Sequence, residues 1–399
     1  MRPRVALALT ALVASALLLE GFTRAHPRVR QLEASAPTSS ASIDARAARL
    51  HAVLAHDGVV YAIEDHFVYA SVDTGLSYRR LGVLPKSGPQ SLMARVRELV
   101  ARSGVVRRVR RYAGPKGMLV LGSGTMVVFY DRIYRSEDGG RTFEAVPETA
   151  PPDLPAPFPS SLGFTVGPGD TVYYGEYTIA DRPNSLRIVR GTDDGRRWEV
   201  AHTFAPGDVF HVHSVTYDPF REGYWVATGD DETEPKLLFT SDHFRTLHTV
   251  GCCSQDWRMV DLVVTEDALY WGSDDNRFRP GIFRYDVIAD ILERVADLDN
   301  PSYHAARLAD GTLAISSTYE PRSPFTRNTR PPAATSLWLS SDGRSWSRAF
   351  SLAADSTEAA NGSRAQLQLP HGDPLPALFA TPWHTAEDAF TTLRFEIRR

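Results

Sequence analysis

A short pattern of residues, S/T-x-D-x-G-x-S/T-aromatic, recurs along this 399-residue chain and constrains its fold more than any other feature. Complete copies read SVDTGLSY and SEDGGRTF. A third copy, GTDDGRRW, keeps the aspartate, glycine and aromatic residue, and a fourth, SSDGRSW, is one residue shorter. Two degenerate copies, TSDHFRTL and FRYDVIADILERV, lie between the third and fourth. The aspartates of the six copies are Asp73, Asp138, Asp193, Asp242, Asp286 and Asp342.

Each copy has the chemistry of a hairpin turn between two strands. The aspartate accepts hydrogen bonds from turn amides, the glycine takes a positive φ, and the aromatic residue covers the turn. The aspartates lie about 44 to 65 residues apart, which is the length of one four-stranded blade. The sequence therefore predicts an all-β fold, a single β-propeller of about seven four-stranded blades, with six also compatible. In the longest interval, SLMARVRELVAR has helical apolar spacing and predicts a short helical insertion after the first blade.

These copies resemble the Asp-box (BNR) repeats of sialidases, sortilin-type receptors, secreted glycoside hydrolases and propeller-type photosystem assembly factors. The resemblance implies a propeller whose boxes lie on the periphery of the blades, and it gives their aspartates a structural role. It brings no reaction with it, because one fold carries many activities.

The first residues predict export. Arg2 and Arg4 precede an apolar run from Val5 to Leu19, the order found in a secretory signal. We expect residues 1–25 to be a signal peptide or an N-terminal anchor, residues 26–48 to be a flexible linker, and residues 49–399 to be the propeller. The predicted location is secreted, periplasmic or at the cell surface, with membrane contact only through an uncleaved anchor.

Charge and cysteine content narrow the remaining classes. A net charge of −4 provides no basic field for a phosphate backbone, so no nucleic-acid partner is expected. No phosphate-loop or dinucleotide motif occurs, so no nucleotide cofactor is implied. The two cysteines, Cys252 and Cys253, are adjacent, and a vicinal disulfide and two packed thiols both remain open.

The candidate functional residues begin at Glu176, within YYGEYT. A carboxylate in such an apolar strand acts as a general base or ligand anchor, or it forms an ion pair with a neighbouring blade's arginine. In HVHSVTYD, His211 and His213 lie two residues apart on a predicted strand and share a face. They suit catalysis or substrate contact, a divalent metal shared with Asp230 or Asp274, or a hydrogen-bonded core. Because no third ligand is fixed by spacing, we predict no cofactor here beyond that metal alternative.

The segment CCSQDWRMVDL adds an amide, an aromatic ring and a guanidinium, in Gln255, Trp257 and Arg258. Arg258 can hold a carboxylate through two hydrogen bonds, and Trp257 either stacks on a sugar ring or fills the core between blades. Tyr303 lies at the comparable place in the following blade.

The order of these segments resembles a group of uncharacterised exported bacterial propellers described as sialidase- or glycosidase-like. True sialidases match poorly, since neither their entry motif nor an arginine trio is present. We expect a carbohydrate-active propeller that binds, and cleaves, a polysaccharide or glycan at its axial face. A hydrolase would use Glu176 with Asp230 or Asp274, whereas a lyase would use Arg258 with His211, His213 or Tyr303. The alternative is a non-catalytic binding or assembly module of the envelope. Oligomeric state is not indicated.

Overall fold

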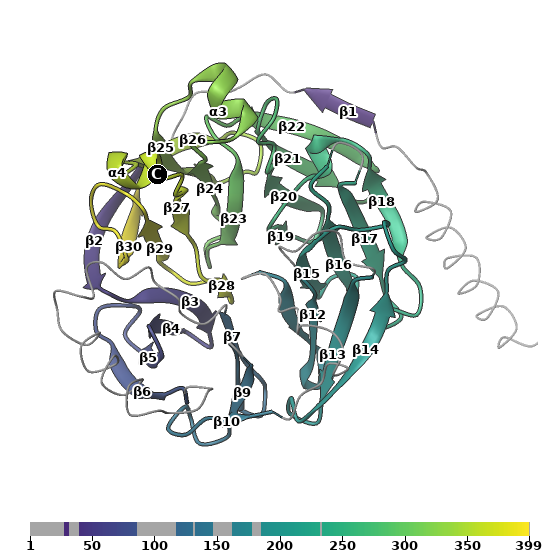
Figure 1. Cartoon of the computed structure of the whole chain (residues 1–399), viewed down its shortest axis with the longest axis vertical. Helices are drawn as coiled ribbons and strands as arrows, with labels where there is room; N and C mark the ends of the chain where they lie inside the picture. Colours follow the sequence, from purple (N-terminus) through teal and green to yellow (C-terminus); the bar gives the residue numbers. More distant parts are fainter. Residues whose placement is uncertain are drawn as a thin grey trace, which may run out of the picture.

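The strands form a ring of antiparallel sheets around a central axis (Figure 1). The computed structural model describes residues 28–31 (backbone only), 40–85, 117–130, 132–146, 162–177, 185–231 and 234–398. In these ranges the sheets resolve into seven four-stranded blades, which confirms the all-β propeller predicted from the repeat. The predicted N-terminal export segment and the helix predicted in SLMARVRELVAR lie outside the described residues. Within the described ranges, none of the helices has the length and apolar character needed to cross a membrane.

Each blade runs from an inner first strand to an outer fourth strand. The strands of blades 1 to 4 are β3 (His51–His56), β4 (Val59–Glu64), β5 (Phe67–Ser71), β6 (Arg79–Val83), β7 (Gly117–Val120), β8 (Met126–Phe129), β9 (Ile133–Ser136), β10 (Glu144–Ala145), β11 (Phe164–Gly167), β12 (Thr171–Gly175), β13 (Arg187–Thr192), β14 (Arg197–Thr203), β15 (Val212–Asp218), β16 (Gly223–Thr228), β17 (Lys236–Thr240) and β18 (His248–Cys252). The strands of blades 5 to 7 are β19 (Val263–Val264), β20 (Ala268–Gly272), β21 (Gly281–Asp286), β22 (Ile291–Asp297), β23 (Ser302–Arg307), β24 (Leu313–Tyr319), β25 (Ala334–Ser340), β26 (Ser347–Ala353), β27 (Ala365–Gln368), β29 (Leu378–Trp383), β30 (Thr391–Arg398) and β2 (Ser40–Ala48). The remaining elements are β1 (Arg28–Gln31), β28 (His371–Gly372), η2 (Pro168–Asp170), η3 (Gln255–Trp257), α3 (Pro324–Thr329) and α4 (Ser356–Ala360).

The two ends of the chain close the ring in blade 7. Strand β2 pairs antiparallel with β30, from Ser40 opposite Arg398 to Ala48 opposite Thr391. This corrects the linker expected over residues 26–48, because residues 40–48 form the outer strand of the last blade. Most side chains of SASIDARAA are small, which suits an edge strand held by ladder hydrogen bonds to one neighbour.

The repeated pattern occupies the turn between the third and fourth strands of blades 1 to 6. Blade 7 has no such hairpin, because its third strand ends the chain and its fourth comes from the N-terminal region. In the complete copy at Asp138, the carboxylate accepts hydrogen bonds from Thr142 N at 3.0 Å and Thr142 Oγ1 at 2.7 Å. The degenerate copy TSDHFRTL keeps this network. Asp242 accepts a hydrogen bond from Thr246 N at 3.0 Å, and Phe244, in place of the glycine, has a positive φ of 67°.

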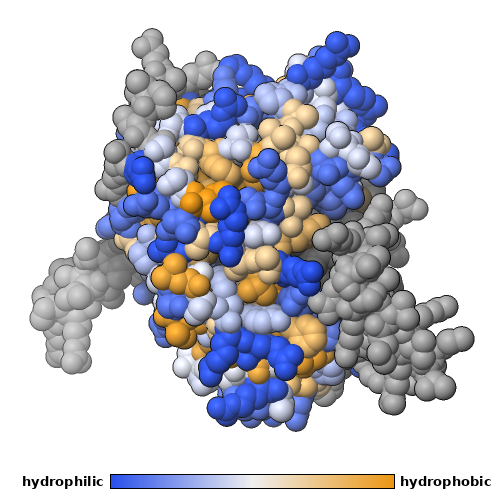
Figure 2. Space-filling view, turned by 90° about the vertical axis from the view of Figure 1, so that its left-hand side faces the viewer, coloured by the Kyte–Doolittle hydropathy of each residue, from blue (hydrophilic) through white to orange (hydrophobic). Residues whose placement is uncertain are grey.

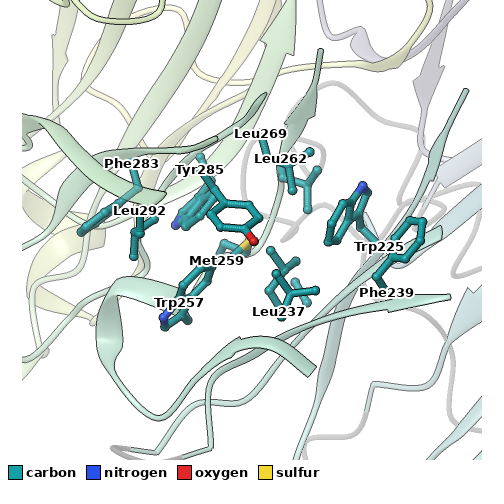
Figure 3. Close-up of a cluster of buried hydrophobic side chains, with 13 residues drawn as sticks. Trp225, Leu237, Phe239, Trp257, Met259, Leu262, Leu269, Phe283, Tyr285 and Leu292 are labelled. Atoms are coloured by element: carbon teal, nitrogen blue, oxygen red, sulfur yellow. The ribbon is translucent and has the colours of Figure 1, made fainter. Parts of the chain in front are cut away.

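The core consists of side chains packed between neighbouring blades. Between blades 4 and 5, Trp225 and Phe239 belong to one cluster with Tyr285 and Phe283, and Met259 lies between the two pairs (Figure 3). Trp257 is only 4% exposed in the same cluster, which corrects the interpretation of its ring as a stacking surface for a sugar. On the side of the ring shown in Figure 2, hydrophobic residues are interspersed with hydrophilic ones.

Candidate functional site

An acidic residue follows the second strand of four consecutive blades. Glu176 follows β12, Asp230 follows β16, Asp274 follows β20 and Glu320 follows β24. Because the first and second strands of a blade are antiparallel, the end of the second lies beside the start of the first. All four carboxylates therefore belong to the same face of the propeller.

The two histidines of blade 4 converge on one of these carboxylates. His211 Nδ1 lies 2.6 Å from Asp230 Oδ2, and His213 Nε2 lies 3.1 Å from Asp230 Oδ1. The pairing register of β15 with β16 shifts between Val212 and Ser214, so His213 is the extra residue of a bulge. Bulges re-aim side chains next to binding sites. The equivalent shift in blade 6 falls at Tyr303.

The surroundings of Asp230 favour its ionised form. Burial alone would raise the pKa of Asp230, but hydrogen bonds from His211 and His213 and the charge of Arg258 outweigh it, so the pKa lies well below its usual range. Both histidines are buried, whereas the Asp230 side chain keeps 25% exposure. Asp230 is thus the member of the cluster that reaches solvent.

Arg258 joins blades 4 and 5 through this carboxylate. Its Nη2 lies 3.1 Å from Asp230 Oδ1 and 2.9 Å from Asp274 Oδ2. Its Nη1 donates to Gln255 at 3.3 Å and to Asn276 at 3.1 Å. The short η3 turn places Gln255 and Arg258 on this face while sending Trp257 into the core. Burial raises the pKa of Asp274, and Arg258 opposes that rise.

Blades 3, 6 and 7 add residues that the sequence analysis missed. Glu320 accepts hydrogen bonds from Tyr303 Oη and from Asn276 Nδ2, the latter at 3.1 Å, and Arg364 Nε lies 3.0 Å from it. Tyr177 stacks on His211 with 4.1 Å between ring centroids. An acidic residue follows the second strand in blades 3 to 6, and an alignment of these blades would have pointed to Glu320.

Glu176 does not join this cluster through its side chain. Its carboxylate accepts from Arg187 Nε at 2.8 Å, Arg187 Nη2 at 2.5 Å and Arg187 N at 3.0 Å, all within blade 3. Burial raises the pKa of Glu176, and the contacts with Arg187 partly offset that rise. This geometry supports the ion-pair interpretation of Glu176 and not the general-base interpretation. The partner arginine belongs to the same blade as Glu176, whereas a neighbouring blade was expected to provide it.

The adjacent cysteines form a disulfide at the edge of the site. Cys252 and Cys253 are bonded, and Cys253 N donates to Pro235 O at 3.0 Å. Gln255 Nε2 donates to Asp231 O at 3.3 Å. These bonds tie the segment that carries Arg258 to the segment that carries Asp230.

The comparisons with known proteins support the fold alone. No protein-family model and no curated protein matches the chain. Among solved structures, the chain is similar to a catalytically inactive virginiamycin B lyase from Staphylococcus aureus with quinupristin, at 11% identity and a TM-score of 0.55, over 90% of this chain and 99% of that chain. A nidogen/laminin complex matches at 13% identity and a TM-score of 0.40, over 62% of this chain and 78% of that chain. A mitotic checkpoint complex matches at 10% identity and a TM-score of 0.49, over 92% of this chain and 95% of that chain.

Proposed function

We propose that the chain is an exported carbohydrate-active propeller, whose axial face binds a polysaccharide containing uronic acids and cleaves it by β-elimination. In this reaction a base removes the proton α to the carboxylate, and the bond from the β carbon to the glycosidic oxygen breaks. A double bond forms between the two carbons, and the leaving oxygen takes a proton. Such a site requires a cation beside the carboxylate, a base and a proton donor.

The observation that carries the proposal is the Arg258–Asp230–His211 arrangement. Arg258 is buried and held by Asp230 and Asp274, so its guanidinium provides a fixed positive charge beside the carboxylate of a bound uronate. Asp230 orients His211 through Nδ1, as a carboxylate orients an imidazole base. Tyr303 is hydrogen-bonded to Glu320 in blade 6, two blades after that of His211, and it is the proton donor in this proposal.

A retaining hydrolase is the second candidate, and it pairs Asp230 with Asp274 instead of pairing either of them with Glu176. Asp230 and Asp274 contact the same Arg258 nitrogen at 3.1 and 2.9 Å, so these two oxygens lie no more than about 6 Å apart. Retaining glycosidases separate their two carboxyl groups by about 5–5.5 Å. Glu176, bound to Arg187, is not needed in this version.

The non-catalytic alternative has one observation in its favour. The charges of this face are largely paired with one another: Arg258 with Asp230 and Asp274, and Glu320 with Arg364. Propellers also fill their axes with satisfied polar groups, and such a face binds without reacting.

One experiment separates the three proposals. The purified chain is incubated with uronate-containing and neutral polysaccharides, and the ultraviolet absorbance of unsaturated uronate and the release of reducing ends are followed together. Both signals indicate a lyase, reducing ends alone indicate a hydrolase, and a thermal shift without products indicates a binding module.

Matched arginine variants locate the reaction. We expect Arg258→Met to lower turnover by about 100- to 1,000-fold, as the loss of a charge-stabilising donor does. Arg279→Met is the control, because Arg279 is exposed in the same blade and pairs only with Asp297 at the surface in the described structure. Equal activity of the two variants would refute the role given to Arg258.

A further inference from the structure

Three side chains on the axial face place metal-ligand atoms close together. One nitrogen each from His211 and His213 and a carboxylate oxygen from Asp230 lie within 4.8 Å of one another. Two imidazoles and a carboxylate are a ligand set for divalent first-row transition ions. The three residues come from the start of β15 and the end of β16, adjacent strands of one blade, so the backbone ladder fixes their spacing.

The hydrogen bonding of His213 favours a cation at this place. His213 Nδ1 lies 2.9 Å from Met259 O, and a carbonyl oxygen only accepts, so Nδ1 carries a proton. In the neutral ring, Nε2 then presents a lone pair to Asp230 Oδ1 at 3.1 Å. Either a second proton or a metal ion resolves this contact. A backbone carbonyl on the far nitrogen is the arrangement that orients metal-binding histidines.

The charges around the cluster favour a cation. Three carboxylates, Asp230, Asp274 and Glu320, are linked to two guanidiniums, Arg258 and Arg364. Asp274 is buried, and its Oδ1 has no hydrogen-bond partner among the described residues. A partly buried group with more carboxylates than guanidiniums is stabilised by an added cation.

We propose that His211, His213 and Asp230 bind a divalent transition ion of the Zn²⁺ class, with water or an anionic substrate completing its coordination. Arg258 Nη2 lies 3.1 Å from Asp230 Oδ1 and holds this ligand in place. The binding of the ion does not rest on the function proposed above. Its use in holding a uronate carboxylate does, and in that version His211 is a ligand of the ion and not the base of the reaction.

Metal binding to the full chain tests the site without any substrate. After treatment with a chelator, the protein is titrated with Zn²⁺ by calorimetry and with Co²⁺ by visible absorption, and Mg²⁺ and Ca²⁺ serve as hard-ion controls. We expect one Zn²⁺ per chain, a Co²⁺ spectrum showing nitrogen ligation, and weak Mg²⁺ and Ca²⁺ binding because these ions prefer all-oxygen sites.

Variants assign the ligands. His213→Gln and Asp230→Asn should each weaken Zn²⁺ binding by at least roughly 100-fold, given that loss of outer partners alone costs 10- to 100-fold. His248→Gln, on the outer strand β18 of the same blade, should bind as the native chain does. Absence of Zn²⁺ and Co²⁺ binding by the native chain, or unchanged binding by a folded His213→Gln variant, would overturn the proposal. Zn²⁺ binding without product from any polysaccharide would leave the metal site standing and reject the reaction.

Discussion

The Glu176–Arg187 pair holds the axial end of blade 3, and its loss should be costly. Arg187→Met removes the guanidinium hydrogen bonds at 2.8 and 2.5 Å and leaves a 2% exposed carboxylate with one backbone N–H at 3.0 Å. Hydrogen bonds to charged groups contribute about 1.5–3 kcal/mol each, and breaking a buried ion pair costs about 3–5 kcal/mol. We therefore expect the free energy of unfolding to fall by about 3–5 kcal/mol at neutral pH.

This loss should depend on pH. Burial raises the pKa of Glu176 and Arg187 partly offsets the rise, so removing Arg187 raises that pKa further. A carboxyl whose pKa is higher in the folded than in the unfolded state binds its proton more tightly when the protein is folded. The free energy of unfolding that it contributes is therefore retained at low pH and lost as the pH rises through the folded-state pKa. The deficit of Arg187→Met should be larger at about pH 8 than at about pH 5.

Urea unfolding, followed by tryptophan fluorescence and far-ultraviolet circular dichroism at both pH values, measures the effect. Arg197→Met is the control, because Arg197 is 82% exposed and should cost no more than about 1 kcal/mol. The double variant Glu176→Gln, Arg187→Met should recover part of the loss, since it buries no charge. A deficit below about 1 kcal/mol, or one that does not vary with pH, would refute this account of the pair.

Three further predictions concern the turns, the closure of the ring and a buried histidine. Asp342→Ala removes hydrogen bonds to Ser340 Oγ, Arg344 N and Ser345 N and should lower the free energy of urea unfolding by about 1–2 kcal/mol; no change would show the turn to be self-supporting. A chain beginning at residue 50 lacks β2 and should melt at a lower temperature or associate through the exposed edge of β30, whereas one beginning at residue 40 should not; equal melting would reject closure by β2. Burial, with the charge of His371, lowers the pKa of His304 to about 3, so stability should be full above about pH 6.5 and fall as the pH drops toward 3; His304→Gln should flatten that fall, and an unchanged profile would contradict it.

The sequence by itself determined the architecture, because the information is local. An aspartate that accepts turn amides needs its partners within four residues, as at Asp138 and Thr142, so the turn is written into eight consecutive residues. The recurrence of the turn then set the blade length. The alternation of side chains along a strand put His211 and His213 on one face, and with the bulge at His213 both rings contact the Asp230 carboxylate. The predicted cluster of His211, His213, Asp230, Arg258 and Asp274 lies together in the structure because each residue lies near the start of a blade's first strand or just after the end of its second strand.

Only the tertiary structure decided the partners of these groups. Arg258 meets Asp230 because blades 4 and 5 are neighbours in a closed ring, and Glu320 meets Arg364 across blades 6 and 7. Glu176 pairs within its blade, and Trp257 turns into the core while its neighbour Arg258 turns to the axis, a difference set by one short 3₁₀ turn. Strand β2 reads as a linker by composition and becomes a strand only because β30, some 350 residues away, presents an unpaired edge. Pairings between such distant segments depend on ring closure, and no local pattern of residues encodes them.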